Sequence, residues 1–410
     1  EWRPARPARD RHRRSARARR VDARASGRLM RVLVIGAGPM GIAAAIGASD
    51  RGHDVTVLER EEVGASLRTW GPARFFSPLR MNVSPRMRAL LGDAMPDADA
   101  LLTGDEYVDR VLVPLVQREP LRGRVRTGCE VVAIGRRGLT RSDYAGHPLR
   151  AERPFRVLTR RDEVFEADVI LDASGGLRVP RAIGIGGLPA RGESTLARLP
   201  IRTLGGLSAA RSSLLGRRIF VLGDGHSAAN AIALLAEIAE EEPSTRVIWA
   251  MRSANRRPCE EVLNDPLPER RDVVARANAL AETPPEFLRV ERKAMIESVA
   301  QNNGHVVVSL TGGRTAEADV LAAFTGYRPD SAFLTELTVE TSPVTEGGAR
   351  LYRAISNITD CLSVPQVAPI DLQSGEPNYF FVGSRSYGRS NGFLLQTGLA
   401  QLETILESLR

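Results

Sequence analysis

The 410-residue sequence is poor in cysteine, histidine and lysine. Its three cysteines, Cys129, Cys259 and Cys361, lie far apart, and no C-x-x-C pair occurs. This excludes a local dithiol redox centre and a zinc site that the sequence alone would reveal. The five histidines are scattered without the spacing of metal ligands, so we expect no metal site.

Long hydrophobic runs are scarce as well. One uncharged stretch, Val32 to Ser49, is long enough to be considered as a membrane-spanning segment. Four glycines and Pro39 interrupt it, and a β-rich start leads into an alanine-rich half, which indicates a strand, a turn and a buried helix. No apolar core follows the basic N-terminal stretch, so no secretory signal is visible. We expect a cytoplasmic protein without membrane contact.

The formal net charge of +8 comes from one segment. Residues 1–29 hold eleven arginines and three acids, so the rest of the chain is neutral overall and indicates no nucleic-acid partner. This segment has few apolar residues to bury, and we expect it to be a disordered Arg-rich tail. It is either a native basic arm or import sequence, or upstream sequence ahead of a start at Met30.

The sequence does contain a glycine-rich turn near its start. An apolar strand runs into Gly36-x-Gly38-x-x-Gly41, and the next strand ends at Glu59. Gly36 permits the tight turn, Gly38 lets backbone N–H groups approach a pyrophosphate, and Gly41 lets helix and strand pack closely. The carboxylate at Glu59 can accept hydrogen bonds from a ribose diol. The other predicted members of this dinucleotide site are Pro39, Met40 and Arg60.

A second glycine-rich turn reads Gly223-x-Gly225-x-x-Ala228, where alanine is an accepted third member. The strand that follows, in TRVIWAMR, ends without an acid and is followed by Arg252. An acid would repel a 2′-phosphate, whereas a guanidinium binds it through charge-assisted hydrogen bonds. The second site is therefore predicted to bind NADPH, unless Arg252 is one of many solvated arginines. The other predicted members of this site are His226 and Ser227.

Two near copies of one motif follow these turns, EADVILDASGG at residues 166–176 and EADVLAAFTGYRPD at residues 317–330. With the glycine turns, they make the sequence resemble the flavoproteins with two dinucleotide-binding domains. There FAD occupies the first domain and a nicotinamide cofactor the second. FTGYRP, which contains Gly326, is similar to the Ala-Thr-Gly-Tyr motif of the N-hydroxylating flavin monooxygenases, with Phe324 in place of alanine. The F-x-G-x-x-x-H signature of the flavin-containing and Baeyer-Villiger monooxygenases is not present.

The resemblance implies an α/β fold with two Rossmann-like dinucleotide-binding domains. The NADPH domain would be inserted in a discontinuous FAD domain. We expect residues 30–185 and 319–410 to form the FAD domain and residues 186–318 the NAD(P)H-binding domain. The stretch GLPARGE, residues 187–193, would be the crossing linker.

Two further segments fit this family. NYFFVGS predicts a strand ending at Gly383, and FLLQTGLAQLETILESL predicts an amphipathic helix that begins near Phe393. In the family, such a glycine and helix N-terminus lie against the flavin, where the helix dipole stabilises negative charge. TWGPARFFSPLRMN, residues 69–82, resembles the loop that lines the flavin ring, with Trp70 at the cofactor; the alternative is a plain aromatic core. The substrate pocket predicted from this loop consists of Phe76, Ser77, Met81 and Asn82.

The resemblance implies an FAD-dependent, NADPH-using oxidoreductase. Hydride transfer to the flavin would be followed by reaction with oxygen to a C4a-(hydro)peroxyflavin. That species would oxygenate an amine, sulfur or carbonyl of a small-molecule substrate. No general base is identifiable, so no catalytic residue is named.

Other functions remain open or are disfavoured. One alternative is an NAD(P)H-dependent flavin reductase of a disulfide or electron-carrier partner, but no dithiol is present and Met40 stands where single-cysteine relatives carry a thiol in the first turn. A sensor that keeps FAD without turnover would have no use for a complete second nucleotide site. Ser390 in GRSNG matches a serine-hydrolase motif, but it falls in a predicted loop rather than at a strand end. The sequence leaves homo-oligomerisation open.

Overall fold

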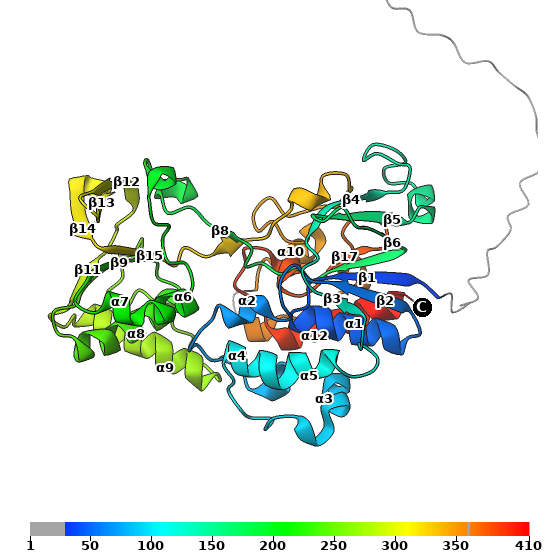
Figure 1. Cartoon of the computed structure of the whole chain (residues 1–410), viewed down its shortest axis with the longest axis horizontal. Coiled ribbons are helices and arrows are strands. Elements are labelled where there is room, and N and C mark those ends of the chain that lie inside the picture. The colour runs from blue at the N-terminus through cyan, green and yellow to red at the C-terminus, as the bar shows by residue number, and fades with distance from the viewer. Residues whose placement is uncertain (1–28, 359–360, 410) are drawn as a thin grey trace, which may run out of the picture.

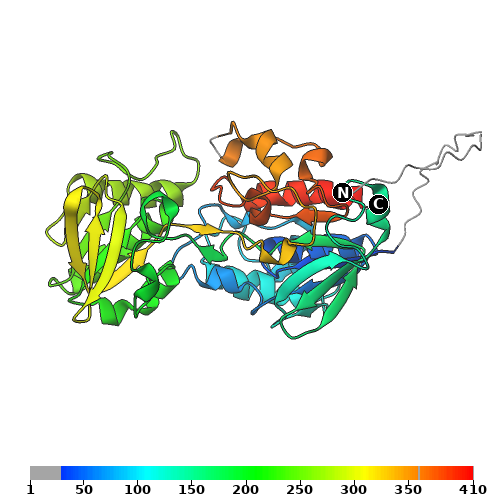
Figure 2. The same cartoon turned by 90° about the horizontal axis from the view of Figure 1, so that it is seen from above.

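A computed structural model of the chain describes residues 29–358 and 361–409, so the tail predicted at residues 1–29 lies, apart from Leu29, outside the described residues. The chain folds into two lobes joined by a narrow crossing (Figure 1, Figure 2). The first lobe contains the early and late parts of the sequence, and the second lobe contains the middle.

The first lobe is built on a five-stranded parallel sheet of order β17-β7-β1-β2-β3. In β1, Val32 to Ile35 are buried, as parallel strands covered on both faces require. Helices α1 and α12 cover one face, and an antiparallel sheet of order β4-β5-β6 covers the other (Figure 1). The strands are β1 (Arg31–Ile35), β2 (Asp54–Leu58), β3 (Val125–Arg126), β4 (Val131–Arg136), β5 (Phe155–Thr159), β6 (Val164–Ala167), β7 (Val169–Asp172) and β17 (Tyr379–Phe381). The helices are α1 (Pro39–Asp50), α2 (Ala65–Arg68), α3 (Pro85–Leu91), α4 (Gly104–Tyr107), α5 (Val113–Val116), α10 (Ala349–Ile355), α11 (Ser384–Tyr387) and α12 (Leu395–Ser408).

The second lobe repeats this plan around a four-stranded parallel sheet of order β11-β10-β9-β15, with an antiparallel sheet of order β12-β13-β14 on one face. No helix in the described part of the chain is long and apolar enough to cross a membrane. The strands are β9 (Arg218–Leu222), β10 (Arg246–Ala250), β11 (Leu288–Glu291), β12 (Ile296–Asn302), β13 (His305–Leu310), β14 (Arg314–Ala318) and β15 (Val320–Ala323). The helices are α6 (Leu204–Ala209), α7 (Arg211–Leu214), α8 (His226–Glu241) and α9 (Pro268–Glu282).

The duplication extends to individual contacts. The Arg31 N–H donates to the Asp168 carboxylate over 2.9 Å, and the Arg218 N–H donates to the Asp319 carboxylate over 2.8 Å. The two acids belong to the two near copies of the EADV motif, each of which leads into a strand that returns beside the first strand of its sheet. The predicted α/β class with two Rossmann-like units is confirmed.

The boundary expected between residues 318 and 319 differs from the structure. β15, which begins at Val320, pairs in parallel with β9, opposite Ile219, and so completes the second sheet. The second lobe therefore continues to Ala323. Local sequence did not show this because parallel pairing joins strands far apart in the chain.

The crossing between the lobes also differs from the expected linker. Two short antiparallel strands form it, β8 (Val179–Pro180) and β16 (Tyr327–Arg328), as Figure 1 shows between the lobes. Residues 187–193 instead lie on the second lobe, where Arg191 forms a bridge with Ser298. The chain crosses once in each direction, and the two crossing segments pair with each other.

Candidate functional site

The first glycine turn joins β1 to α1. Gly36 has a φ of +96°, and a Cβ there would lie 2.6 Å from the carbonyl oxygen of Ala173. A Cβ on Gly41 would collide with the carbonyl oxygen of Gly36. At Gly38, by contrast, no atom lies within 4 Å of the Cβ position. The outer two glycines are required by the fold, whereas Gly38 faces open space that a pyrophosphate could approach.

Glu59 follows β2 and lies beside this turn. Its carboxylate accepts the Ala37 N–H over 2.7 Å and the Glu61 N–H over 2.9 Å. These bonds orient the carboxylate and leave lone pairs for ribose hydroxyls. No side chain of the described residues caps α1, so its first N–H groups can bind an anion. Arg60 is exposed and pairs with Glu61 over 2.6 Å.

The second glycine turn joins β9 to α8 and repeats the geometry of the first. Gly223 has a φ of +126°, and its Cβ would lie 2.6 Å from the carbonyl oxygen of Phe324. Nothing lies within 4 Å of a Cβ on Gly225, and no described side chain caps α8. Phe324 follows β15 as Ala173 follows β7. The backbone of each near-copy motif therefore packs against the first glycine of one turn. Both turns therefore fit a dinucleotide.

Sequence reasoning missed Trp249, whose side chain is hydrogen-bonded to the backbone of the second turn. It is fully buried in β10, and its indole N–H donates to the carbonyl oxygen of Gly223 over 2.7 Å. A tryptophan inside an apolar strand reads as ordinary core, so no signal in the sequence marked it. Ala228 is fully buried where α8 packs on the sheet, and Ser227 is exposed at the turn.

His226 connects the second turn to the first lobe. Its ring meets that of Phe76 edge-on, with 5.1 Å between the ring centroids. Desolvation, followed by repulsion from Arg270, lowers the pKa of His226 and so favours the neutral imidazole, although the residue as a whole is exposed. A neutral ring packs on the aromatic edge of Phe76 without the desolvation that a cation would need.

The lobes also meet at a pair of glycines. The Gly205 N–H donates to the carbonyl oxygen of Thr69 over 2.9 Å. A Cβ on Gly71, whose φ is +58°, would lie 2.6 Å from the Cα of Gly205. The loop after α2 therefore lies against the start of α6 and against His226, which places the predicted pocket loop at the second nucleotide turn.

The aromatic residues of this loop divide between core and interface. The Phe75 ring is buried between Trp70, at 4.9 Å between centroids, and Tyr107, at 5.1 Å. Its neighbour Phe76 instead contacts the second lobe. The core interpretation therefore holds for Phe75, whereas a role of Phe76 in a substrate pocket stays a prediction.

Ser77 and Asn82 hold the loop together. The Ser77 hydroxyl donates to Asn82 Oδ1 over 2.8 Å, and Asn82 Nδ2 donates to the carbonyl oxygen of Ser77 over 2.9 Å. Both side chains are buried, so their polar groups serve the loop conformation. Phe76 and Met81 are half-buried, and a substrate contact by members of this loop stays a prediction.

Three residues predicted from distant parts of the sequence come together beside the first turn. A Cβ on Gly383, whose φ is +68°, would lie 2.5 Å from Met40 Cγ and 3.6 Å from the Phe393 ring. A Cβ on Gly398 would lie 2.6 Å from the same ring, which also meets Tyr387 edge-on at 5.3 Å. We did not predict Gly398, although a glycine one turn inside an amphipathic helix was a signal of close approach.

A buried ion pair that sequence reasoning missed fixes the strand that ends before Gly383. Asp172 accepts the Tyr379 hydroxyl over 2.8 Å and Arg385 Nε over 3.1 Å, and both partners of the ion pair are fully buried. Arg385 also donates to Ser331 Oγ over 3.0 Å and to the carbonyl oxygen of Glu346 over 3.2 Å. These bonds tie β7, β17 and α11 together next to the first turn.

The arginines after β10 have different surroundings. Arg257 pairs with Glu282 over 3.1 Å and with Glu261. Arg252 is exposed and has no acidic partner among the described residues. Its guanidinium group is therefore free to bind an anionic ligand. Gly326, with a φ of +81°, lies beside the side chain of Arg181 at the crossing.

The three cysteines lie in separate surroundings, and none forms a disulfide. The Cys129 thiol donates to Glu163 over 3.3 Å, and burial raises the pKa of Cys259 to about 12. Cys361 is half-buried and accepts a hydrogen bond from Arg270 over 3.3 Å. No group of metal-ligating side chains is gathered within the described ranges.

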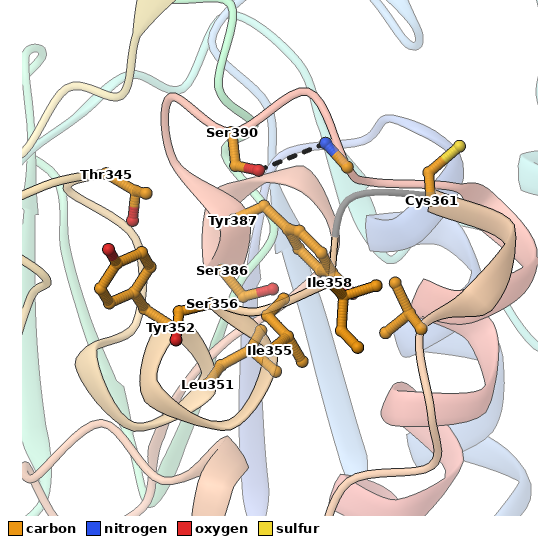
Figure 3. Close-up of a pocket in the computed structure, with 12 residues that line it drawn as sticks. Thr345, Leu351, Tyr352, Ile355, Ser356, Ile358, Cys361, Ser386, Tyr387 and Ser390 are labelled. Atoms are coloured by element: carbon orange, nitrogen blue, oxygen red, sulfur yellow. Dashed lines mark hydrogen bonds between the residues drawn. The ribbon is translucent and has the colours of Figure 1, made fainter. Parts of the chain in front are cut away.

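A small pocket of about 100 Å³ lies on the first lobe near α10 and α11 (Figure 3). Ser390 lines it and accepts the Gly392 N–H over 3.3 Å, in the loop after α11. The described residues that line the pocket include no histidine and no acid, so they offer no partners for a serine nucleophile. Ser390 is therefore not a nucleophile elbow.

The sequence profile of the pyridine nucleotide-disulphide oxidoreductase family matches residues 30–375. No curated protein matches the sequence. Among solved structures, the bacillithiol disulfide reductase of Bacillus cereus is similar, with a TM-score of 0.65 and 17% identity over 93% of this chain and 99% of that chain. Ornithine N-hydroxylase from Kutzneria sp. 744 has a TM-score of 0.60 and 16% identity over 93% and 99%. Lactococcus lactis thioredoxin reductase has a TM-score of 0.59 and 16% identity over 93% and 97%.

Proposed function

The chain belongs to the pyridine nucleotide-disulphide oxidoreductase family, and from this premise we propose that it is an FAD-dependent, NADPH-using monooxygenase of a small molecule. Membership of the family makes it an oxidoreductase with a flavin and a nicotinamide cofactor. The observation that supports the assignment of FAD to one turn and NADPH to the other is a difference in charge between two otherwise equivalent turns. Glu59 stands beside the first turn, and Arg252, which pairs with no acid among the described residues, follows the corresponding strand of the second.

In this proposal the first turn holds FAD. Gly38 and the uncapped N-terminus of α1 bind the pyrophosphate, and the Glu59 carboxylate accepts hydrogen bonds from the ribose hydroxyls. Met40, Gly383 and Phe393 form an apolar wall beside the turn for the flavin ring. Bound FAD supplies the hydride acceptor and the oxygen-reactive centre.

The second turn holds NADPH in the same way, with Gly225 and the N-terminus of α8 at the pyrophosphate and Arg252 at the 2′-phosphate. The contact between Phe76 and His226 lies where the two lobes meet. There the Phe76 ring of the first lobe lies beside the start of α8, where the nicotinamide nucleotide would bind.

Oxygen is the favoured acceptor of electrons because the chain has no internal dithiol to receive them. The three cysteines have separate neighbours, and Met40 occupies the first turn. The second candidate function is an NAD(P)H-dependent reductase of an external disulfide. The structural similarity to bacillithiol disulfide reductase favours it, and a similarity of the same order to ornithine N-hydroxylase favours oxygenation.

One experiment separates the two functions. The FAD-loaded protein is mixed with NADPH and oxygen, with or without a panel of small primary amines, thioethers and ketones. We expect oxygen uptake coupled to a product that is heavier by one oxygen atom. Rapid reduction of a low-molecular-weight disulfide, with no oxygenated product from any panel member, would replace the proposal with the reductase.

Arg252→Ala is expected to raise the KM for NADPH by about 10- to 150-fold and to leave that for NADH unchanged. Loss of charged hydrogen bonds to a phosphate weakens binding by about 1.5–3 kcal/mol, which corresponds to that range. Steady-state kcat/KM for both nucleotides measures the preference. The matched control is Arg257→Ala, since Arg257 already pairs with Glu282. An unchanged ratio in Arg252→Ala would contradict the assignment.

A further inference from the structure

Arg181 is a residue of the crossing whose backbone is held at the carboxyl end of the second sheet. Its N–H donates to the carbonyl oxygen of Gly326 over 3.0 Å. Its own carbonyl oxygen accepts from Arg202 over 2.8 Å and from Thr325 over 2.9 Å. β15 ends at Ala323, so these partners lie just beyond the edge where the second glycine turn opens. Ligands bind open parallel sheets at this edge.

The Arg181 side chain is half-buried and has no acidic partner among the residues that the structure describes. Burial, and then repulsion from Arg389 and Arg252, lower the pKa of Arg181, and Glu346 is the acid that opposes them. Glu346 is already engaged: it accepts two hydrogen bonds of 2.9 Å from Arg389 and one of 3.1 Å from Arg328. Arg181 and Arg252 therefore both lie beyond the carboxyl ends of strands in the second sheet, and neither contacts a carboxylate of the described residues.

These two groups come from different parts of the fold. Arg252 follows β10 of the second sheet, whereas Arg181 follows β8, which leads out of the first lobe. Two like charges at one edge of a sheet repel each other, and an anion between them relieves that repulsion. A phosphate dianion balances two guanidinium charges and offers each a pair of acceptor oxygens.

We propose that Arg181 and Arg252 bind the same 2′-phosphate of NADPH, one guanidinium from the crossing and one from the second sheet. This inference rests on the proposed function, because it concerns the nucleotide of the second turn. It makes Arg181 a specificity-determining residue that no glycine motif includes. NADPH then bridges the second lobe and the strand that leads out of the first lobe.

The test measures binding rather than turnover. Adenosine 2′,5′-bisphosphate and adenosine 5′-monophosphate are titrated calorimetrically into the FAD-loaded full chain. Arg181→Ala should weaken the bisphosphate about tenfold and leave the monophosphate unchanged, and Arg181→Lys should recover part of the loss. The control Arg276→Ala should bind both as the wild type does, since Arg276 is exposed and pairs with Glu237 over 3.2 Å. In Arg181→Ala/Arg252→Ala the loss should be smaller than the sum of the single losses, because both groups share one phosphate.

The outcomes separate this inference from the proposed function. A wild type that binds both nucleotides equally would remove the NADPH preference and the role of Arg181 with it. A wild type that prefers the bisphosphate, with the same preference in Arg181→Ala, would overturn the role of Arg181 alone. Equal weakening of both nucleotides in Arg181→Ala, or strictly additive losses in the double variant, would also overturn it.

Discussion

Gly38→Ala is expected to give a folded protein that retains little FAD, whereas Gly225→Ala should keep FAD and lose affinity for NADPH. Gly38 has φ −79° and ψ −175°, and Gly225 has φ −89° and ψ 178°. Alanine adopts both conformations without strain, and no protein atom lies within 4 Å of either Cβ. The added methyl group therefore meets only the ligand. Overpacking costs about 1–3 kcal/mol, which is about a 5- to 150-fold loss of affinity.

The flavin absorbance of the purified variants, their circular dichroism and an NADPH titration measure these effects. Gly135→Ala is the matched control, because its Cβ would meet only the Glu336 side chain at an ordinary 3.7 Å. Gly41→Ala gives a contrast, since its Cβ collides with the turn itself and damages the fold as well as the site. A folded Gly38→Ala protein with full FAD content would show that the first turn does not hold the flavin.

Glu376→Gln is expected to destabilise the first lobe by about 3–5 kcal/mol. The carboxylate of Glu376 is fully buried and accepts Arg136 Nε over 2.8 Å and Arg150 Nε over 3.0 Å. Thr338 donates to it through its N–H and its hydroxyl, each over 2.8 Å. Without the negative charge, these two buried guanidinium groups contact no carboxylate in the described part of the chain. Denaturant unfolding of the FAD-loaded protein at pH 7 measures the loss.

The same variant carries a pH signature. Burial by itself raises the pKa of Glu376, but hydrogen bonds from Thr338 and Arg136 outweigh it and hold that pKa below the ordinary 4.5. The stabilisation is therefore complete above pH 4.5 and is lost as the pH falls through the lowered folded value. The difference between wild type and Glu376→Gln should shrink over that acid range. The control Glu340→Gln should lose less than about 1 kcal/mol, since its ion pair with Arg350 is half-exposed. A loss in Glu376→Gln no larger than in this control would contradict the prediction.

Contiguous residues determined much of the site. The order of glycines around Gly38 and Gly225, and the residues at the ends of the following strands, could be read from the sequence because a strand–turn–helix unit is local. The C-terminal helix that begins at Leu395 was readable from its apolar periodicity. The near-copy motifs indicated two equivalent units, but only the structure showed that each motif packs against the first glycine of its turn.

Residues next to each other in the chain took different roles where only packing decides. Phe75 is buried beside Trp70 and Tyr107, whereas Phe76 contacts the other lobe. Sequence reasoning assigned Ser77 and Asn82 to a pocket, and the structure uses their polar groups within the loop. No local pattern separates these roles, because each depends on what approaches from elsewhere in the fold.

The sequence by itself determined that this protein has two glycine-rich turns of different charge, since each turn depends on residues within one βαβ unit. The tertiary structure alone decided which sheet β15 joins, which arginines share a carboxylate and, among the described residues, which have no acidic partner. Asp172 and Arg385 are 213 residues apart, and Arg136 and Glu376 are 240 apart. Such pairs form when the sheets assemble and exclude water from both partners, and no local sequence pattern encodes that event.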